Sequence, residues 1–202
     1  MPTVVRNGRS IHHSLEGDGP GLVLIPGLGS GARLFGTLPR RFARLGFRCA
    51  AIDPVGLEPS SPLPGGVFDF AEAALDALAV AATLPAPVTL VGTSLGGKVA
   101  LCAAATQSEA AHRLVMLCSS AIHSARQKRI YRWFELLCTE VEGRLLGELT
   151  APFLFGETFL GERPGVVDDI VRSTKPSEAS RAFMQAQVRA LQAFDGSSLC
   201  SA

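Results

Sequence analysis

The run Gly92-Thr93-Ser94-Leu95-Gly96 places a serine between small residues, directly after an apolar segment and before an Ala/Gly-rich one. A serine hydroxyl becomes a useful nucleophile when a base takes its proton, and a sharp turn between a strand and a helix exposes it to substrate. Gly92 and Gly96 allow the two backbones to pass closely at such a turn. The spacing therefore predicts that Ser94 is a catalytic nucleophile; the alternative is a chance Gly-Ser loop.

A second glycine-rich run, Pro26-Gly27-Leu28-Gly29, could supply the other part of this chemistry. Attack on a carbonyl group leaves a negative charge on its oxygen, and two N–H donors are needed to stabilise that charge. We expect the backbone N–H groups of Leu28 and Leu95 to form this oxyanion hole. The alternative is that the glycines only form a tight turn.

Both runs follow short apolar segments that are typical of strands buried in a parallel sheet. We expect strands at Leu22–Ile25, Arg48–Ile52, Val88–Val91 and Leu114–Leu117, and a hairpin of Val4–Val5 with Ser10–Leu15 around Asn7-Gly8. Helices are expected at 38–45, 68–84 and 97–105. Strands and helices alternate up to Ser120, which indicates an α/β fold with a mostly parallel sheet and helices on both faces.

The alternation ends at Ala121. We expect a helix over 130–149, a Gly/Phe/Pro-rich stretch to Pro164, and mostly helix over 166–194 with a break near Pro176. The predicted domains are therefore an α/β core at 1–121, a helical cap at 122–180, and a return helix with a tail at 181–202.

These motifs resemble the α/β-hydrolase fold superfamily, and within it the capped esterases, enol-lactonases and haloperoxidase-like enzymes. The resemblance covers about residues 10–120 well and the cap loosely. In the first loop Gly27 matches the family pattern, Phe35 stands at its aromatic position, and Pro26 replaces its histidine. The resemblance implies a serine hydrolase that acts on a carboxylic ester, a lactone or a related acyl compound.

The loop that follows the second core strand also matches in part. Asp53, Gly56 and Ser60 fit the family's Asp-x-x-Gly-x-Gly-x-Ser pattern, whereas Glu58 replaces the second glycine. A catalytic acid in this family comes after the serine along the chain, so we expect Asp53 to be structural.

The family's acid and histidine, which follow later strands, have no counterpart after Phe194, so we expect a chain truncated at its C-terminus. We expect His123 to be a surface residue at the cap hinge, and its role as the candidate base is the alternative. Asp195 could approach the pocket only if the tail folds back. Without later strands, Leu114–Leu117 becomes a sheet edge on which a second chain could pair.

Composition narrows the class of protein. The 202 residues carry 19 basic and 18 acidic side chains, which predicts no nucleic-acid partner, and the basic residues of 126–132 fit a solvated helix face. The sequence offers no metal-ligand spacing, no cofactor motif and no apolar run long enough for a membrane. The five cysteines are widely spaced, which favours buried free thiols and a cytoplasmic location.

Six aromatic side chains gather in the predicted cap: Tyr131, Trp133, Phe134, Phe153, Phe155 and Phe159. They could form a pocket for a small apolar acyl or ester substrate, or they could be the core of the cap itself. Three functions stay open: an enzyme that transfers an acyl group to water, a ligand-binding or interaction protein that has kept the pocket, and a non-functional fragment.

Overall fold

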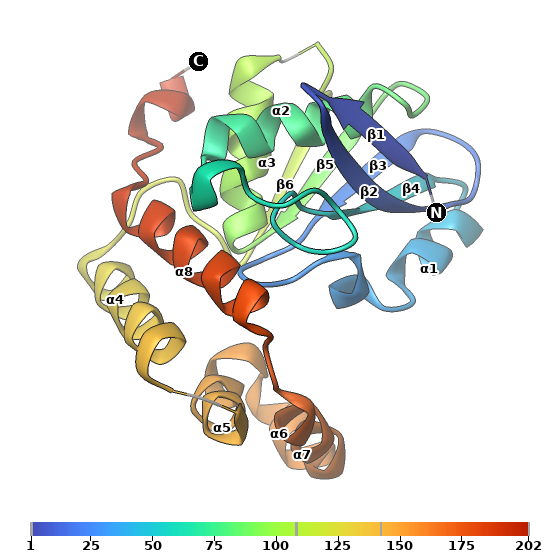
Figure 1. The fold of residues 1–202 in the computed structure, drawn as a ribbon. Helices are drawn as coiled ribbons and strands as arrows, with labels where there is room; N and C mark the ends of the chain where they lie inside the picture. The colour runs from blue at the N-terminus through green and yellow to red at the C-terminus, as the bar shows by residue number, and fades with distance from the viewer. Residues whose placement is uncertain (1, 108, 142, 202) are drawn as a thin grey trace.

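The computed structural model describes residues 2–107, 109–141 and 143–201. Six strands form one sheet in the order β1-β2-β4-β3-β5-β6 (Figure 1). The strands are β1 Thr3–Arg6, β2 Arg9–Glu16, β3 Gly21–Ile25, β4 Arg48–Asp53, β5 Thr89–Thr93 and β6 Arg113–Leu117. β1 and β2 run antiparallel to their neighbours, and β4, β3, β5 and β6 are parallel to one another. The predicted fold class is therefore confirmed.

The N-terminal hairpin follows from its turn residues. Asn7 and Gly8 both have positive φ angles, 49° and 74°, which is the backbone that a two-residue hairpin loop requires. Each of the predicted core strands is present within two residues of its expected ends.

Helices cover both faces of the sheet. They are α1 Leu38–Arg44, α2 Phe70–Ala81, α3 Leu95–Thr106, α4 Ala125–Glu140, α5 Gly143–Leu154, α6 Glu157–Glu162, α7 Pro164–Ser173 and α8 Glu178–Ala193, with short 3-10 turns η1 Ala32–Phe35, η2 Pro64–Gly66 and η3 Ser197–Ser201. α2 and α3 lie side by side on one face, α1 lies on the other, and α4–α7 lie away from the sheet (Figure 1).

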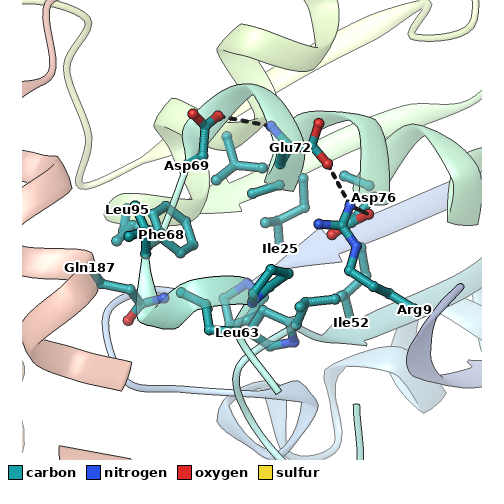
Figure 2. Close-up of a pocket in the computed structure, with 18 residues that line it drawn as sticks. Arg9, Ile25, Ile52, Leu63, Phe68, Asp69, Glu72, Asp76, Leu95 and Gln187 are labelled. Carbon is teal, nitrogen blue, oxygen red and sulfur yellow. Dashed lines mark hydrogen bonds and ion pairs between the residues drawn. The ribbon is translucent and has the colours of Figure 1, made fainter. Parts of the chain in front are cut away.

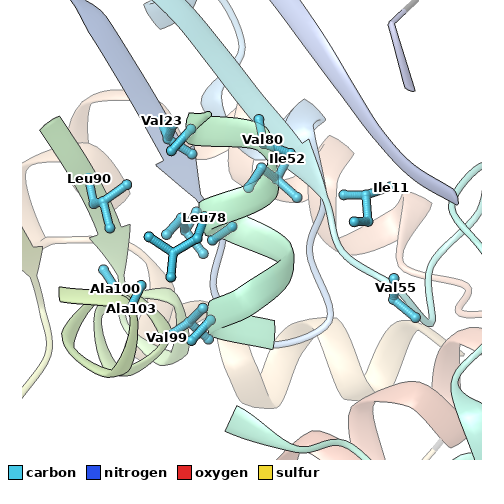
Figure 3. Packing of buried hydrophobic residues seen from close by; sticks show 14 of the residues in the cluster. Ile11, Val23, Ile52, Val55, Leu78, Val80, Leu90, Val99, Ala100 and Ala103 are labelled. Carbon is cyan, nitrogen blue, oxygen red and sulfur yellow. The ribbon is translucent and has the colours of Figure 1, made fainter. Parts of the chain in front are cut away.

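The alternating side chains of β3 show why this strand is wholly apolar. Val23 and Ile25 belong to the cluster beneath α2 and α3, together with Leu78 and Val99 (Figure 3). Leu22 and Leu24 belong to a second cluster on the α1 face. A strand buried on both faces needs apolar residues at every position, so the continuous run marks the centre of the sheet.

Two helix predictions beyond residue 121 are wrong in detail. The single helix expected over 130–149 is two helices, α4 and α5, and Gly143 has a φ of 56° at the start of the second one. The Gly/Phe/Pro-rich stretch is itself helical, because α5 continues through Pro152 and α6 follows it. The break near Pro176 is present, and the predicted boundary at 180 falls inside α8.

The strand β6 has β5 on one side only, and in the described residues no strand follows it. Its side chains Val115 and Leu117 are 40% and 46% exposed. Pairing of a second chain at this edge stays a prediction.

The five cysteines are all free thiols. Cys49 and Cys138 are buried as expected. Cys118 and Cys200 are exposed, so the prediction that all five thiols are buried is wrong. Over the described ranges, none of the helices combines the length and apolar composition needed to cross a bilayer.

Candidate active site

Ser94 lies on the sharp turn between β5 and α3. Its backbone has φ 54° and ψ −113°, a conformation that is strained for a residue with a side chain. Its N–H donates to the Leu117 carbonyl of β6 at 2.8 Å, and its own carbonyl accepts from Gly97 N–H at 3.0 Å. These bonds hold the serine at the carboxyl end of the sheet, where α/β folds bind ligands.

The glycines of this turn lie in close contact with neighbouring backbone, Gly96 with the end of β3 and the first loop, and Gly92 with the start of α3. A β-carbon at position 96 would lie 2.2 Å from the carbonyl oxygen of Ile25 and 2.5 Å from that of Pro26. A β-carbon at position 92 would lie 2.1 Å from the carbonyl oxygen of Gly96. Only glycine therefore fits at these two positions without movement of the backbone.

The first loop passes directly beside the serine. A β-carbon on Gly27 would lie 3.5 Å from the Ser94 Cβ atom. Ser30 N–H donates to the Gly27 carbonyl at 3.2 Å, and Gly29 has a φ of 65°, so residues 27–30 form a tight turn. Leu28 is at the centre of this turn, and Leu95 is the first residue of α3, whose early N–H groups have no partner within the helix.

Asp53 is part of the support of this loop. Its Oδ1 atom accepts from Ala32 N–H at 2.8 Å, and its Oδ2 atom lies 2.8 Å from His12 Nδ1. Asp53 is on β4 and His12 on β2, and β3 separates β4 from β5, so the two residues lie on strands about 10 Å and about 14 Å from the serine strand. Its contacts fit the structural role expected for Asp53.

We expect Asp53→Ala to lower the free energy of unfolding by about 2–3 kcal/mol, because it leaves the partly buried Ala32 N–H without its charged acceptor. Asp18→Ala is the control, since the Asp18 side chain is 93% exposed and pairs only with Arg48 in the described contacts. Its expected effect is below about 0.5 kcal/mol. Equal urea midpoints for the two variants would contradict the structural role of Asp53.

His123 is not the surface residue that the sequence suggested. Its side chain is buried, with the ring of Tyr131 at 4.8 Å and that of Phe194 at 5.9 Å between centroids. Burial, together with the positive charges of Lys98 and Lys128, lowers the pKa of His123 below its usual value, which favours the neutral imidazole that a base requires. No hydrogen bond joins His123 to Ser94 in the part of the chain that the structure describes.

The C-terminal residues after α8 fold back toward the loop that follows β6 and contains His123. Gly196 N–H donates to the Ala121 carbonyl at 3.0 Å, just after β6. Asp195 is exposed, and its charge raises the pKa of His123 and so opposes the effect of burial. The hydrogen bonds from Ser197 lower the pKa of Asp195 below its usual value, with smaller effects of Lys128 and His123 in the same direction.

Lys98 is a buried group that the sequence interpretation overlooked. It lies on α3 four residues after Ser94, is 1% exposed, and donates from Nζ to the Ser120 carbonyl. Its Nζ atom is also 5.2 Å from the centre of the Phe194 ring. Burial lowers the pKa of Lys98 to about 8. A lysine within an otherwise small and apolar helix was the signal that could have identified it.

A cavity of about 240 Å³ lies behind the first loop, between the ends of β3 and β4 and the helix α2 (Figure 2). Its walls are mainly apolar, with Ile25, Ile52 and Leu95 among them. Of its four charged lining residues, Arg9 pairs with Glu72 and Asp76, and Asp69 accepts from the N–H groups of Ala71 and Glu72 at the start of α2. The cavity therefore offers mainly apolar surface, and all four of its charged side chains are already engaged in ion pairs or hydrogen bonds.

Five of the six aromatic residues of the predicted cap contact one another. Trp133 lies 5.1 Å from Phe134 and 4.4 Å from Phe153, and Phe155 stacks on Phe159 at 5.3 Å, between ring centroids. Tyr131 differs, because it packs against the core cluster beside His123. These contacts show that the aromatic residues pack on one another, but Phe153 and Phe159 are 54% and 40% exposed, so the group is only partly a core of the cap.

The described residues contain no group of three His, Cys, Asp or Glu side chains that could hold a metal ion.

Known proteins were compared with this chain by sequence and by structure. A model of the alpha/beta hydrolase fold family matches residues 20–137. The pimeloyl-[acyl-carrier protein] methyl ester esterase of Aeromonas hydrophila subsp. hydrophila is 40% identical over 115 residues. That match covers 55% of this chain and 42% of the esterase, so the chain spans less than half of this curated relative.

Solved structures give the same fold. The enol-lactonase from Burkholderia xenovorans LB400 matches with a TM-score of 0.78 at 20% identity, over 96% of this chain and 75% of the lactonase. An esterase from Exiguobacterium antarcticum matches with a TM-score of 0.77 at 19% identity, over 96% of this chain and 74% of the esterase. At these identities the two structures show similarity of fold.

Proposed function

Because this chain belongs to the alpha/beta hydrolase fold family, we propose that Ser94 is the nucleophile of an enzyme that hydrolyses carboxylic esters or lactones. The observation that carries the proposal is the position of Ser94. It has a positive φ between β5 and α3, and Gly27 of the first loop lies beside it. Family membership confirms the resemblance seen in the sequence; the roles of individual residues belong to the proposal.

In the proposed reaction, Ser94 Oγ attacks the carbonyl carbon of the substrate while a base accepts its proton. The N–H groups of Leu28 and Leu95 stabilise the negative charge on the carbonyl oxygen. Collapse of this intermediate releases the alcohol, which takes up a proton, and leaves an ester on Ser94. Water then hydrolyses that ester and frees the acid.

A small apolar acyl group is the proposed substrate class. The cavity next to Leu95 has mainly apolar walls, and its charged lining residues are engaged in ion pairs or, for Asp69, in hydrogen bonds from α2. The relatives include a methyl ester esterase and an enol-lactonase by name, so an ester or lactone carbonyl is the proposed target. The aromatic residues of the cap add little support, since most of them contact one another.

His123 is the proposed base among the described residues. It is buried near the carboxyl end of β6, and burial favours its neutral form. Asp195 is the nearby acid, as its effect on the pKa of His123 indicates.

A second candidate is a ligand-binding protein that does not catalyse. The observation in its favour is that no histidine is hydrogen-bonded to Ser94 among the residues that the structure describes. In that case the pocket would bind an ester or acid without turnover.

Labelling with a fluorophosphonate probe separates the two candidates. The purified chain should be phosphonylated at Ser94, and Ser94→Ala should abolish the label, as mass spectrometry of the tryptic peptide would show. Loss of at least about 100-fold in labelling rate in His123→Ala would identify the base. An unlabelled but folded wild-type chain would contradict the proposed enzyme and leave the binding protein.

A further inference from the structure

The helix α8 reaches the loops that follow β3 and β4 with three buried or partly buried side chains. Phe183 packs against Gly56 so closely that a β-carbon on Gly56 would lie 2.4 Å from the Phe183 ring. Met184 likewise packs against Gly29, with its Cγ and Sδ atoms 2.6 Å from the position of a β-carbon there. Gln187 makes the third contact, and it is polar.

Gln187 is 1% exposed, although glutamine is rarely buried so completely. Its Oε1 atom accepts from Gly29 N–H at 2.7 Å, across a sequence separation of 158 residues. Figure 2 shows its amide group directed from α8 toward the cavity that it lines. A buried polar side chain with this single strong bond has a defined task at that position.

The bond fixes one particular peptide plane. Gly29 N–H and the Leu28 carbonyl belong to the same planar unit and point in opposite directions. The carbonyl accepts from Ser30 Oγ at 3.2 Å on one side, while Gln187 holds the N–H on the other. The Leu28 N–H lies in the preceding Gly27–Leu28 plane, so the Gln187 bond acts on it by anchoring the whole 27–30 turn against α8.

The other side of Leu28 is held independently. Gly27 lies against Ser94, and its carbonyl accepts from Ser30 N–H at 3.2 Å. Gly29 has a φ of 65°, so it is free to adopt several backbone conformations unless something external selects one. In the described structure Gln187 and Met184 are the side chains that make this selection.

We propose that Gln187 is a positioning residue, which anchors the 27–30 turn to α8 and so keeps Leu28 N–H facing the oxygen of the reacting carbonyl. This rests on the proposed function of Ser94 and extends it, because it makes α8 a part of the oxyanion hole. Gln187 does not touch the substrate in this role; it acts through the loop.

The test compares Gln187→Met with Gln187→Glu and with a control on the same helix. Methionine keeps the shape of the side chain but has no strong acceptor, whereas glutamate keeps an acceptor for Gly29 N–H. Gln185→Met is the control, because Gln185 Nε2 donates to the Cys138 carbonyl at 3.1 Å and does not contact the loop. Amide hydrogen exchange, followed by NMR at Gly29 and Leu28, reads the loop without requiring activity.

We expect the Gly29 amide to be protected in the wild type, and to exchange about tenfold faster in Gln187→Met. Gln187→Glu should restore most of the protection, and Gln185→Met should leave it unchanged. Exchange of Gly29 at the rate of an unstructured peptide in the wild type would overturn the proposal, even if a variant did not fold. Unchanged exchange in Gln187→Met would overturn it as well.

Phosphonylation of Ser94 provides the second measurement. Gln187→Met should lower the maximal rate of labelling about tenfold, with little change in the probe concentration that gives half of that rate. A loosened loop with an unchanged labelling rate would overturn the positioning role. Absence of labelling in the wild type would instead contradict the function of Ser94, and the exchange data would still decide whether Gln187 holds the loop.

Discussion

Gly96→Ala is expected to lower the free energy of unfolding by more than about 3 kcal/mol, although it adds only one methyl group. The added carbon would lie 2.2 Å from the Ile25 carbonyl oxygen, and real contacts of this kind are longer. Ile25 is paired with Gly92 in the sheet, so its carbonyl cannot move away without breaking the strand register. The turn that carries Ser94 would therefore have to open.

Gly161→Ala is the matched control for this substitution. Gly161 lies within α6, and a β-carbon there would meet nothing within 4 Å. Alanine should stabilise a helical position by about 0.5–1 kcal/mol relative to glycine. Urea denaturation of the two variants measures the difference in their free energies of unfolding. A similar midpoint for both would contradict the close approach of the Gly96 and Ile25 backbones.

The second large effect concerns pH and Lys98. Burial lowers its pKa in the folded chain from 10.5 to about 8. Between these values the unfolded chain binds more protons than the folded chain, so the contribution of Lys98 to stability rises with pH from 8 to 10.5. Below pH 8 both forms are protonated and the cost of burying the charge is constant. The rise amounts to about 3 kcal/mol.

Lys98→Met isolates this contribution. Burial raises the pKa of Cys102 to about 11, which makes stability fall over a similar range of pH and opposes the effect. Both proteins should therefore be measured in a Cys102→Ala background, and the stability of the lysine form relative to the methionine form should rise from pH 8 to 10.5. Lys128→Met is the control. Because Lys128 is exposed, this variant should show the same pH dependence of stability as the protein that retains Lys98. A constant difference in stability between the lysine and methionine forms across this range would mean that the amine is solvated.

The core could be predicted because its signals are local. The four apolar residues of Leu22–Ile25 mark a strand that is buried on both faces, and the structure buries all of them. Asn7-Gly8 specifies its hairpin turn by its own backbone preferences. Gly92 and Gly96 likewise predict the tight turn around Ser94, because a close backbone approach requires glycine at both positions.

The region after β6 could not be predicted as well, because distant contacts decide it. Pro152 ordinarily opposes a helix, yet α5 continues through it while Phe153 packs on Trp133 of α4. His123 packs against Tyr131, and also against Phe194, which is far along the chain. Nothing near Gln187 in the sequence indicates that its partner is Gly29.

The contact between Gln187 and Gly29 also has a consequence for how the protein is made. A chain that emerges from the ribosome completes β3, β4 and β5 long before α8 exists, so the sheet can form while the loop at residue 29 still lacks its acceptor. The loop then gains its final shape only when α8 docks, which closes a contact 158 residues apart. The reactivity proposed for Ser94 would accordingly appear only after α8 has been synthesised and has docked.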